Sequence, residues 1–387
     1  MAEVYGGADL NIAATSANDA SEGCFFNRKK AWRHQVRSSA TDGKLYDMYP
    51  DYYSNDGPDR LATRAWVVQE RYLSRRALHF TELQVFWECD QHAASEIFPA
   101  GHSPTAPLDM VHRNFALQKR PLSMTSWPGI VNRYTYATLT RSTDKLVAIG
   151  GLAQIIQDNM NDSYVAGLWG SCLEIQLGWC MNYRTTVDRS KKNARIRPYT
   201  APTWSWASMR GEILMMDEIT QPKKLDTETL DQLCIQVQNV NVKYVADSNF
   251  GEVQEANLRL RCDALLYGSV EYKQWENQKI YFGSSVHAVD VYASFDCVDI
   301  DPEGPLISVC ILPIREHNAS RAGFGLFLER TEKPGEYQRI GFYKNKVAFH
   351  MAEMSKTGRI TSENSDSNFV RVEVDADGKE EYFIDLV

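Results

Sequence analysis

The densest group of polar side chains in an otherwise apolar segment lies at residues 64–71. Arg64, Glu70 and Arg71 occur where apolar residues recur at helical spacing. Glu70 could act as a general acid or base if burial raised its pKa. It could equally form an ion pair with Arg64 or Arg71 that holds the helix against the next segment. Both interpretations stay open, and Glu70, Arg64, Arg71 and the later Glu88 are the weak candidates for catalytic residues.

A second set of side chains has the chemistry of zinc ligands. His79, Cys89 and His92 lie close together in the sequence, beside Glu88, and Zn²⁺ accepts such ligands. However, the chain has no C-x-x-C pair, and a buried Cys and a surface His are ordinary at a strand end. The motifs G-x-S-x-G, G-x-x-x-x-G-K-[ST] and H-E-x-x-H do not occur either. We therefore expect no bound metal and no cofactor.

Aromatic side chains are the weak candidates for ligand binding. The segment PTWSWAS at residues 202–208 carries Trp204 and Trp206. Trp66 lies in the predicted helix that carries Glu70 and Arg71. Aromatic-lined clefts between domains are common ligand sites, so a pocket could lie between this segment and the C-terminal part of the chain. Packing in the core is the competing interpretation for Trp204 and Trp206.

The composition is that of a folded protein and argues against several functional classes. The 387 residues are enough for two or three domains, and 11% of them are aromatic, unlike disordered chains. A net charge of −8 argues against non-specific nucleic-acid binding, which needs clustered Lys and Arg. The sequence shows no membrane span and no signal peptide. Its 8 scattered cysteines are typical of reduced thiols, so we expect a cytoplasmic protein.

The elements that would position the polar side chains can be predicted from periodicity. Residues 8–14 form an apolar run that is typical of a buried strand. Residues 61–72 have helical spacing. Two short strands are predicted at 77–80 and 84–89, with a turn at Thr81 and Glu82, which gives a hairpin.

The rest of the chain divides into a helical part and a strand-rich part. Helices are predicted over 127–139, 143–159 and 164–181, with Ser142 or Thr143 as an N-cap of the second. Beyond residue 215 the period changes to two, and strands are predicted at 234–244, 257–266, 279–295, 306–314, 323–330, 338–343 and 369–386. The predicted fold class is α+β, with an antiparallel β sandwich or barrel at the C-terminal end.

Several blocks of the sequence resemble the fungal heterokaryon-incompatibility (HET) domain family. Residues 61–80, LATRAWVVQERYLSRRALHF, are similar to the last signature block of that domain, and FWEC at 86–89 also matches. The start, MAEVY followed by ADLNIAA at 8–14, resembles the family segment M-x-x-I-Y-x-x-A-x-x-T-I-x-A. Segments similar to the region after that domain are DKLVAIGGLA at 144–153, YVAGLW at 164–169 and PTWSWAS at 202–208.

The resemblance implies a partial HET domain with a TIR-like α/β fold. The family's first two blocks, L-S-Y-x-W-G and W-I-D-x-x-C-I-x-Q, are not found, so we expect the N-terminal half of the domain to be missing. Some TIR-fold proteins cleave NAD, and because such a site would need that half, we expect no NAD hydrolysis. The predicted domains are a C-terminal portion of a HET-like domain at 1–98, a linker at 99–122, a helical region with the Trp-rich segment at 123–215, and an antiparallel β domain at 216–387.

Two functional hypotheses follow from these observations. In the first, the chain is a HET-like protein of fungal non-self recognition that acts through contacts with a protein partner. In the alternative, a HET-like scaffold serves as a cofactor-free cyclase or hydrolase in fungal specialised metabolism and binds a small molecule. Neither hypothesis involves nucleic acid or a membrane. Genes for polyketide or terpene synthesis beside the locus would favour the enzyme.

Overall fold

The structure, a computed structural model, divides by its contacts into two units. The N-terminal unit comprises Met1–Ser123 with Ala137–Leu139, and the C-terminal unit comprises Met124–Tyr136 with Thr140–Val387. Both helices and strands contribute, which confirms the predicted α+β class. The residues that the structure describes are 2–27, 36–39, 45–48, 60–82, 84–96, 99–101, 122–182, 194–215, 233–271, 278–283, 288–297, 306–315, 323–345, 360, 368–374 and 380–387.

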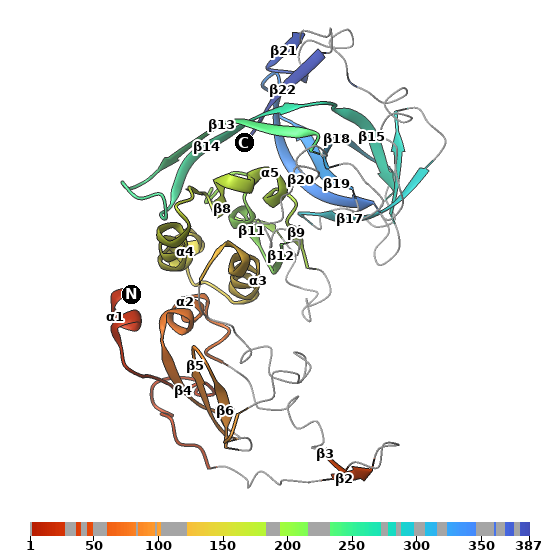
Figure 1. Ribbon diagram of the computed structural model, residues 1–387. Helices are drawn as coiled ribbons and strands as arrows, with labels where there is room; N and C mark the ends of the chain where they lie inside the picture. Colours follow the sequence, from red (N-terminus) through yellow and green to blue (C-terminus); the bar gives the residue numbers. More distant parts are fainter. Residues whose placement is uncertain are drawn as a thin grey trace. The chain divides into compact units, whose positions relative to one another are not determined.

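The N-terminal unit is built on a four-stranded sheet. Its elements are α1 (Ala2–Gly7), β1 (Asn11–Ala13), β2 (Val36–Ser39), β3 (Leu45–Met48), α2 (Ala65–Leu73), β4 (Arg76–Phe80), β5 (Val85–Cys89) and β6 (Ala93–Ser95). The strand order is β1-β4-β5-β6, with β1 parallel to β4 and the other neighbours antiparallel (Figure 1). Strands β2 and β3 form a separate antiparallel pair. Most of the predicted linker at 99–122 lies outside the described residues.

The predicted strand at residues 8–14 lies in this sheet, but its predicted burial is wrong. Only Asn11–Ala13 form β1, which lies at the edge of the sheet beside β4. Ile12 in the middle of β1 is 60% exposed. A continuous apolar run cannot separate a central strand from an edge strand, because it carries no information on how many neighbours the strand has.

The helix and the hairpin predicted at 61–89 are both present. Helix α2 begins at Ala65, because residues 60–63 form a turn, and it ends at Leu73. The hairpin turn is closed by Thr81, whose main-chain N–H and hydroxyl donate to the carbonyl of Gln84 at 3.2 and 2.7 Å. The Thr81 hydroxyl thus hydrogen-bonds the main chain of the turn, as Ser and Thr hydroxyls do in such turns.

Short helices and strands form the first part of the C-terminal unit. They are η2 (Met124–Ser126), α3 (Trp127–Tyr136), η3 (Ser142–Lys145), α4 (Val147–Met160), β7 (Tyr164–Val165), β8 (Leu168–Trp169), η4 (Gly170–Cys172), α5 (Leu173–Gln176), β9 (Cys180–Met181), β10 (Ala194–Arg195), η5 (Trp206–Ser208), β11 (Met209–Arg210) and β12 (Ile213–Leu214). Helices α3 and α4 confirm two of the three predicted helices. The predicted N-cap is wrong, because Ser142 and Thr143 belong to η3 and α4 begins only after Leu146.

The third predicted helix, over residues 164–181, is wrong. The chain instead makes a tight hairpin of β7 and β8, followed by α5 and β9. At the turn, Ala166 has φ 46° and Gly167 has φ 98°, values that no right-handed helix accommodates. The apolar spacing of this segment therefore reflects burial of nearly every side chain rather than one helical face.

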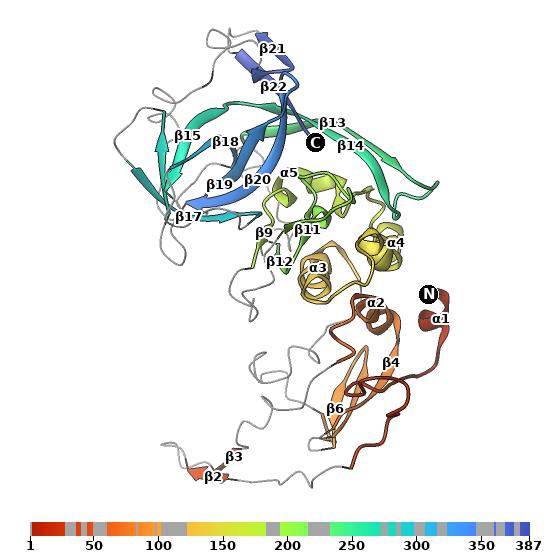
Figure 2. The ribbon, with the colours of Figure 1, turned by 180° about the vertical axis from the view of Figure 1, so that it is seen from behind.

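Long antiparallel strands make up the second part of this unit. They are β13 (Ile235–Tyr244), β14 (Val253–Cys262), β15 (Leu266–Glu271), β16 (Gln278–Phe282), β17 (Ala288–Phe295), β18 (Ile307–Arg315), β19 (Phe324–Arg330), β20 (Glu336–Asn345), β21 (Arg371–Val374) and β22 (Glu380–Leu386). Six of them close into a barrel in the order β15-β16-β17-β20-β19-β18 (Figures 1 and 2). Strands β13, β14 and β22 extend the same sheet from β20. The antiparallel barrel agrees with the predicted β layout. However, the strands predicted at 279–295 and 369–386 are each two strands, β16 with β17 and β21 with β22, because the chain turns back and pairs with itself.

Alternation along the strands fills the barrel with apolar side chains. Strand β15 alternates buried and less buried residues, and β18 and β19 are buried almost throughout. Inside, the rings of Phe295 and Phe327 stack at 5.1 Å, with Tyr343 beside Phe327 at 5.4 Å. The regions predicted at 123–215 and 216–387 fall almost entirely in this one unit.

The turn at Gly167 yields a test of the fold. A Cβ added there would lie 2.8 Å from Nε1 of Trp206, and the positive φ is unfavourable for any other L-residue. We expect Gly167→Ala to lower the free energy of unfolding by roughly 1–3 kcal/mol, as judged by urea denaturation. The matched control is Gly129→Ala in α3, where the Cβ meets nothing within 4 Å and should stabilise the helix by up to about 1 kcal/mol. Equal effects of both variants would contradict the strained turn.

Candidate functional site

A buried carboxylate lies between α2 and the β4–β5 hairpin. Side chains alternate between the two faces of a hairpin, so His79 of β4 and Phe86 and Glu88 of β5 share the buried face. Glu88 lies opposite Ala77 in the register of the two strands. Because Ala77 is small, a long side chain from α2 can reach the carboxylate.

Arg71 of α2 is that long side chain. Its Nε donates to Oε2 of Glu88 at 2.9 Å, and its Nη2 donates to Oε1 at 3.1 Å, so the ion pair is bidentate. Glu88 is 1% exposed and Arg71 is 8% exposed. Two charges can remain this deeply buried only because each compensates the other at close range.

His79 extends the network to the loop after β1. Its Nε2 lies 3.1 Å from Oε2 of Glu88, and its Nδ1 lies 3.3 Å from the hydroxyl of Thr15. A carboxylate can only accept, so Nε2 of His79 carries the proton in this contact. Hydroxyl, imidazole and carboxylate together could transfer a proton, but Thr15 and His79 are 3% and 6% exposed. The arrangement joins three elements and offers a substrate no approach.

The other candidates near α2 have different surroundings. Glu70 accepts a hydrogen bond from the hydroxyl of Tyr5 in α1, and burial followed by this carboxylate raises the pKa of Tyr5 to about 12. Arg64 is exposed at the start of α2, and Trp66 is half-buried. Sequence reasoning named Arg64 or Arg71 as an ion-pair partner of Glu70, and in the structure Arg71 pairs with Glu88. Strand alternation, which turns Glu88 toward the helix, was the signal that could have found this pair.

Trp204 and Trp206 lie in the core of the C-terminal unit, and both are 0% exposed. The indole N–H groups of Trp206 and Trp127 donate to the same carbonyl, that of Gly167, at 2.8 and 3.0 Å. Trp179 donates its indole N–H to the carbonyl of Trp204 at 2.9 Å. In this structure the Trp-rich segment packs and anchors the turn, and neither of its indoles reaches the surface.

A buried arginine joins the barrel to the Trp-rich part of the same unit. Arg339 of β20 is 0% exposed, and its Nε and Nη2 pair with Asp296 at 3.1 and 3.2 Å. Its Nη1 and Nη2 also donate to the carbonyls of Leu177 and Trp179, each at 2.6 Å. Arg195 lies alongside, 3.7 Å from Asp296. Sequence analysis missed this cluster because its members are far apart in the chain and match no motif.

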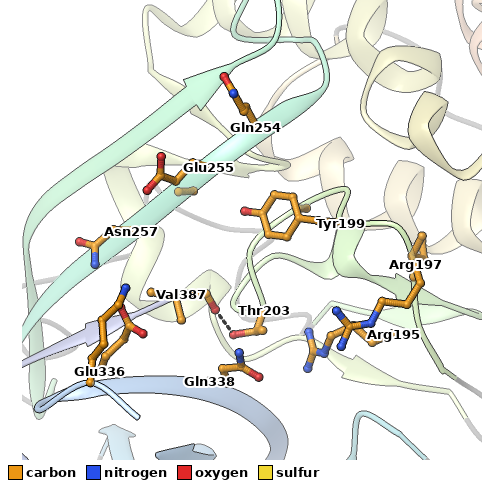
Figure 3. Close-up of a pocket in the computed structure, with 14 residues that line it drawn as sticks. Arg195, Arg197, Tyr199, Thr203, Gln254, Glu255, Asn257, Glu336, Gln338 and Val387 are labelled. Carbon is orange, nitrogen blue, oxygen red and sulfur yellow. Dashed lines mark hydrogen bonds and ion pairs between the residues drawn. The ribbon is translucent and has the colours of Figure 1, made fainter. Parts of the chain in front are cut away.

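A polar pocket of about 430 Å³ lies next to this cluster (Figure 3). It is bounded by residues 195–203, by the first half of β14 and by the start of β20. Its volume is within the usual range for sites that hold small molecules. The sequence placed a possible pocket at the border of residues 202–208 and the β region, and this pocket lies at that border, lined by Thr203 of that segment.

Two structural findings bear on the expectations about metal ions and membranes. No group of three or more His, Cys, Asp and Glu side chains is placed to hold a metal ion in the described part of the chain. The absence of a metal and of a cofactor stays a prediction. Among the helices described above, none has both the length and the apolar character required to cross a bilayer.

Lys145 is another buried ionisable side chain of the C-terminal unit. It is 7% exposed, its Nζ donates to the carbonyl of Met209, and it lies 5.7 Å from the ring centroid of Trp206. Burial, and then the nearby Arg210, lower the pKa of Lys145 to about 7. In the unfolded chain this amine titrates near its ordinary pKa of about 10.4.

The buried ion pair in the N-terminal unit gives a prediction for Glu88. Glu88→Ala should lower the free energy of unfolding by about 3–5 kcal/mol, because it leaves Arg71 charged and buried without its carboxylate. Amide hydrogen exchange over α2, β4 and β5 measures the effect within this unit. Glu70→Ala, which removes the hydrogen bond with Tyr5, should cost about 1 kcal/mol. Exchange that rises equally in the two variants would refute the assignment.

The low pKa of Lys145 gives a prediction for pH. Between pH 7 and about 10.4 the unfolded chain binds more protons at this amine than the folded chain, so the stability it contributes rises with pH and is lost as pH falls to 7. Relative to Lys145→Met, the wild type should gain about 2 kcal/mol between pH 7 and pH 9 in urea unfolding. A difference between the two proteins that does not change with pH would show that Lys145 is charged in the folded state throughout.

Comparison with known proteins bears on the N-terminal unit. Residues 1–70 match the model of the family described as heterokaryon incompatibility protein (HET). No curated protein and no solved structure matches the chain. The matched residues include β1 and most of α2, the elements for which the sequence blocks at 1–14 and 61–80 indicated the same family. The match supports a HET-domain protein.

Proposed function

We propose that this chain is a fungal, cytoplasmic protein of HET-type non-self recognition that acts through contacts with another protein. The observation that carries the proposal is the family match over residues 1–70. HET-type function in the general sense follows from that match. The finer points, namely the fungal source, the compartment and action through contacts, are parts of the proposal.

Exposed apolar side chains in the matched stretch support action through contacts. Val4, Leu10, Ile12 and Phe25 are 69%, 42%, 60% and 86% exposed. Contiguous exposed apolar patches mark interaction surfaces, and we propose that these side chains contribute to one such surface. Ile12 lies on β1, an edge strand, and an edge strand is where another chain can add a strand by main-chain hydrogen bonding.

The polar network of the same unit supports this choice over catalysis. Arg71, His79 and Glu88 are each under 9% exposed, and each has a partner within the network. Groups that are saturated and shielded from solvent position a scaffold, whereas catalytic groups must touch the substrate. The surface of the unit is therefore the better candidate for its activity.

A second function has one specific observation in its favour. The pocket beside residues 195–203 is where the alternative hypothesis places a ligand. On this reading a HET-like scaffold serves as a cofactor-free cyclase or hydrolase in specialised metabolism. Genes for polyketide or terpene synthesis beside the locus would raise it above the first proposal.

Growth tests in pairs of fungal strains show whether the chain recognises a protein partner. Expression of the chain should produce growth arrest in a strain that carries the recognised partner, and Ile12→Asp should abolish the arrest by placing a charge on the exposed side of β1. The matched control is Val245→Asp, because Val245 is 61% exposed and lies in the C-terminal unit. Circular dichroism verifies that both variants fold. Arrest that persists with folded Ile12→Asp, or no arrest with any strain pair, would sink the contact proposal.

A further inference from the structure

The polar pocket of the C-terminal unit carries charges of opposite sign on opposite sides. Figure 3 shows Arg195 and Arg197 on one side and Glu255 and Glu336 on the other, with the ring of Tyr199 between them. All five residues line the pocket. Opposite charges on the two sides of a pocket of about 430 Å³ limit the kinds of molecule that the pocket can hold.

The cationic side is rigid and carries excess positive charge. Nη1 of Arg195 donates to the hydroxyl of Ser208 at 3.0 Å, and Nη2 donates to the carbonyl of Arg339 at 2.7 Å. The Arg195 side chain is only 18% exposed. The nearest carboxylate, Asp296, is shared with the buried Arg339, so one negative charge faces two guanidinium groups. Arg197 adds an exposed positive charge at the rim.

The acidic side comes from two different strands. Glu255 projects from β14, and Glu336 stands at the start of β20. Glu336 accepts hydrogen bonds from the hydroxyl of Thr331 at 2.8 Å and from Nζ of Lys333 at 3.2 Å. Lys333 also lines the pocket and compensates part of the charge of Glu336, so Glu255 contributes most to the negative charge of this side. Burial and then Glu255 raise the pKa of Tyr199 to about 12, so its hydroxyl stays protonated and neutral between the two sides at pH 7.

This lining disfavours several ligand classes. A polyanion such as a nucleotide would meet Glu255 and Glu336, and a polycation would meet Arg195 and Arg197. An apolar ligand would remove water from these charges without replacing it. A molecule with an anionic group at one end and a cationic group at the other compensates both sides at once, through charge-assisted hydrogen bonds.

We propose that this pocket binds a small zwitterion, with its carboxylate at Arg195 and Arg197 and its ammonium group at Glu255 and Glu336. Free amino acids, ω-amino acids and dipeptides have this chemistry and fit a pocket of this volume. The inference specifies a ligand class for the second candidate function. It does not depend on recognition through the N-terminal unit, so failure of the growth test leaves it standing, and failure of binding leaves recognition standing.

Isothermal titration calorimetry on the full chain tests the proposal. The probes are glycine, β-alanine, 4-aminobutanoate, 6-aminohexanoate and diglycine, which together vary the distance between the two charges. For each probe the matched compounds lack one charge, for example hexanoate and hexylamine for 6-aminohexanoate. We expect at least one zwitterion to bind with a Kd at least about tenfold below that of both its matched compounds.

Variants identify the two sides of the pocket. Arg197→Gln and Glu255→Gln, both at exposed positions, should each weaken binding of that zwitterion by about tenfold or more. Lys279→Gln and Asp290→Asn on β16 and β17 are the matched controls, because they remove the same charges outside the pocket and should leave the Kd unchanged. The proposal is overturned if no zwitterion binds the wild type with millimolar or better affinity, or if the singly charged compounds bind as tightly. Equal weakening by the control variants would also overturn it.

Discussion

The C-terminal unit depends on one interaction, the burial of the Arg339 guanidinium. A charge with 0% exposure persists only if its donors find acceptors, and here Asp296, Leu177 and Trp179 supply them. The guanidinium also stacks on the Trp179 ring, 3.3 Å from its centroid. Barrel strand β20 must therefore meet residues 177–179 in one register, since any slip would leave a buried charge without partners.

The main chain of the same arginine positions the Trp-rich segment and the pocket. Its N–H donates to the hydroxyl of Thr203 at 3.0 Å, and its carbonyl accepts a hydrogen bond from Nη2 of Arg195 at 2.7 Å. Thr203 in turn donates its N–H to the main-chain oxygen of Val387 at 3.0 Å. The pocket wall at residues 195–203 is thus held to β20 by bonds to a single residue, Arg339, which also ties the core.

Local sequence patterns predicted many of the helices and strands. The features that depend on contacts between residues distant in sequence could not be predicted from such patterns. Alternation along residues 235–244 and 324–330 indicated the strands, and helical spacing with a following turn indicated α2 and its hairpin. The helix predicted over 164–181 failed because the φ angles of Ala166 and Gly167 depend on tertiary contacts that periodicity does not contain. For the candidate site, the sequence named Arg71 and Glu88 without pairing them. It left Trp204 and Trp206 open between ligand contact and core packing; both are 0% exposed, and their neighbours at 195–203 line the pocket.

Buried charges are compensated differently in the two units. In the N-terminal unit, Arg71, His79 and Glu88 form one hydrogen-bonded network that holds a helix on a hairpin. In the C-terminal unit, Asp296 has to serve both Arg339 and Arg195, so compensation is incomplete and positive charge extends toward the pocket. A guanidinium held by a carbonyl and a hydroxyl has little freedom left to lose when it meets a carboxylate. The bonds that stabilise the core therefore also prepare the pocket for a charged ligand.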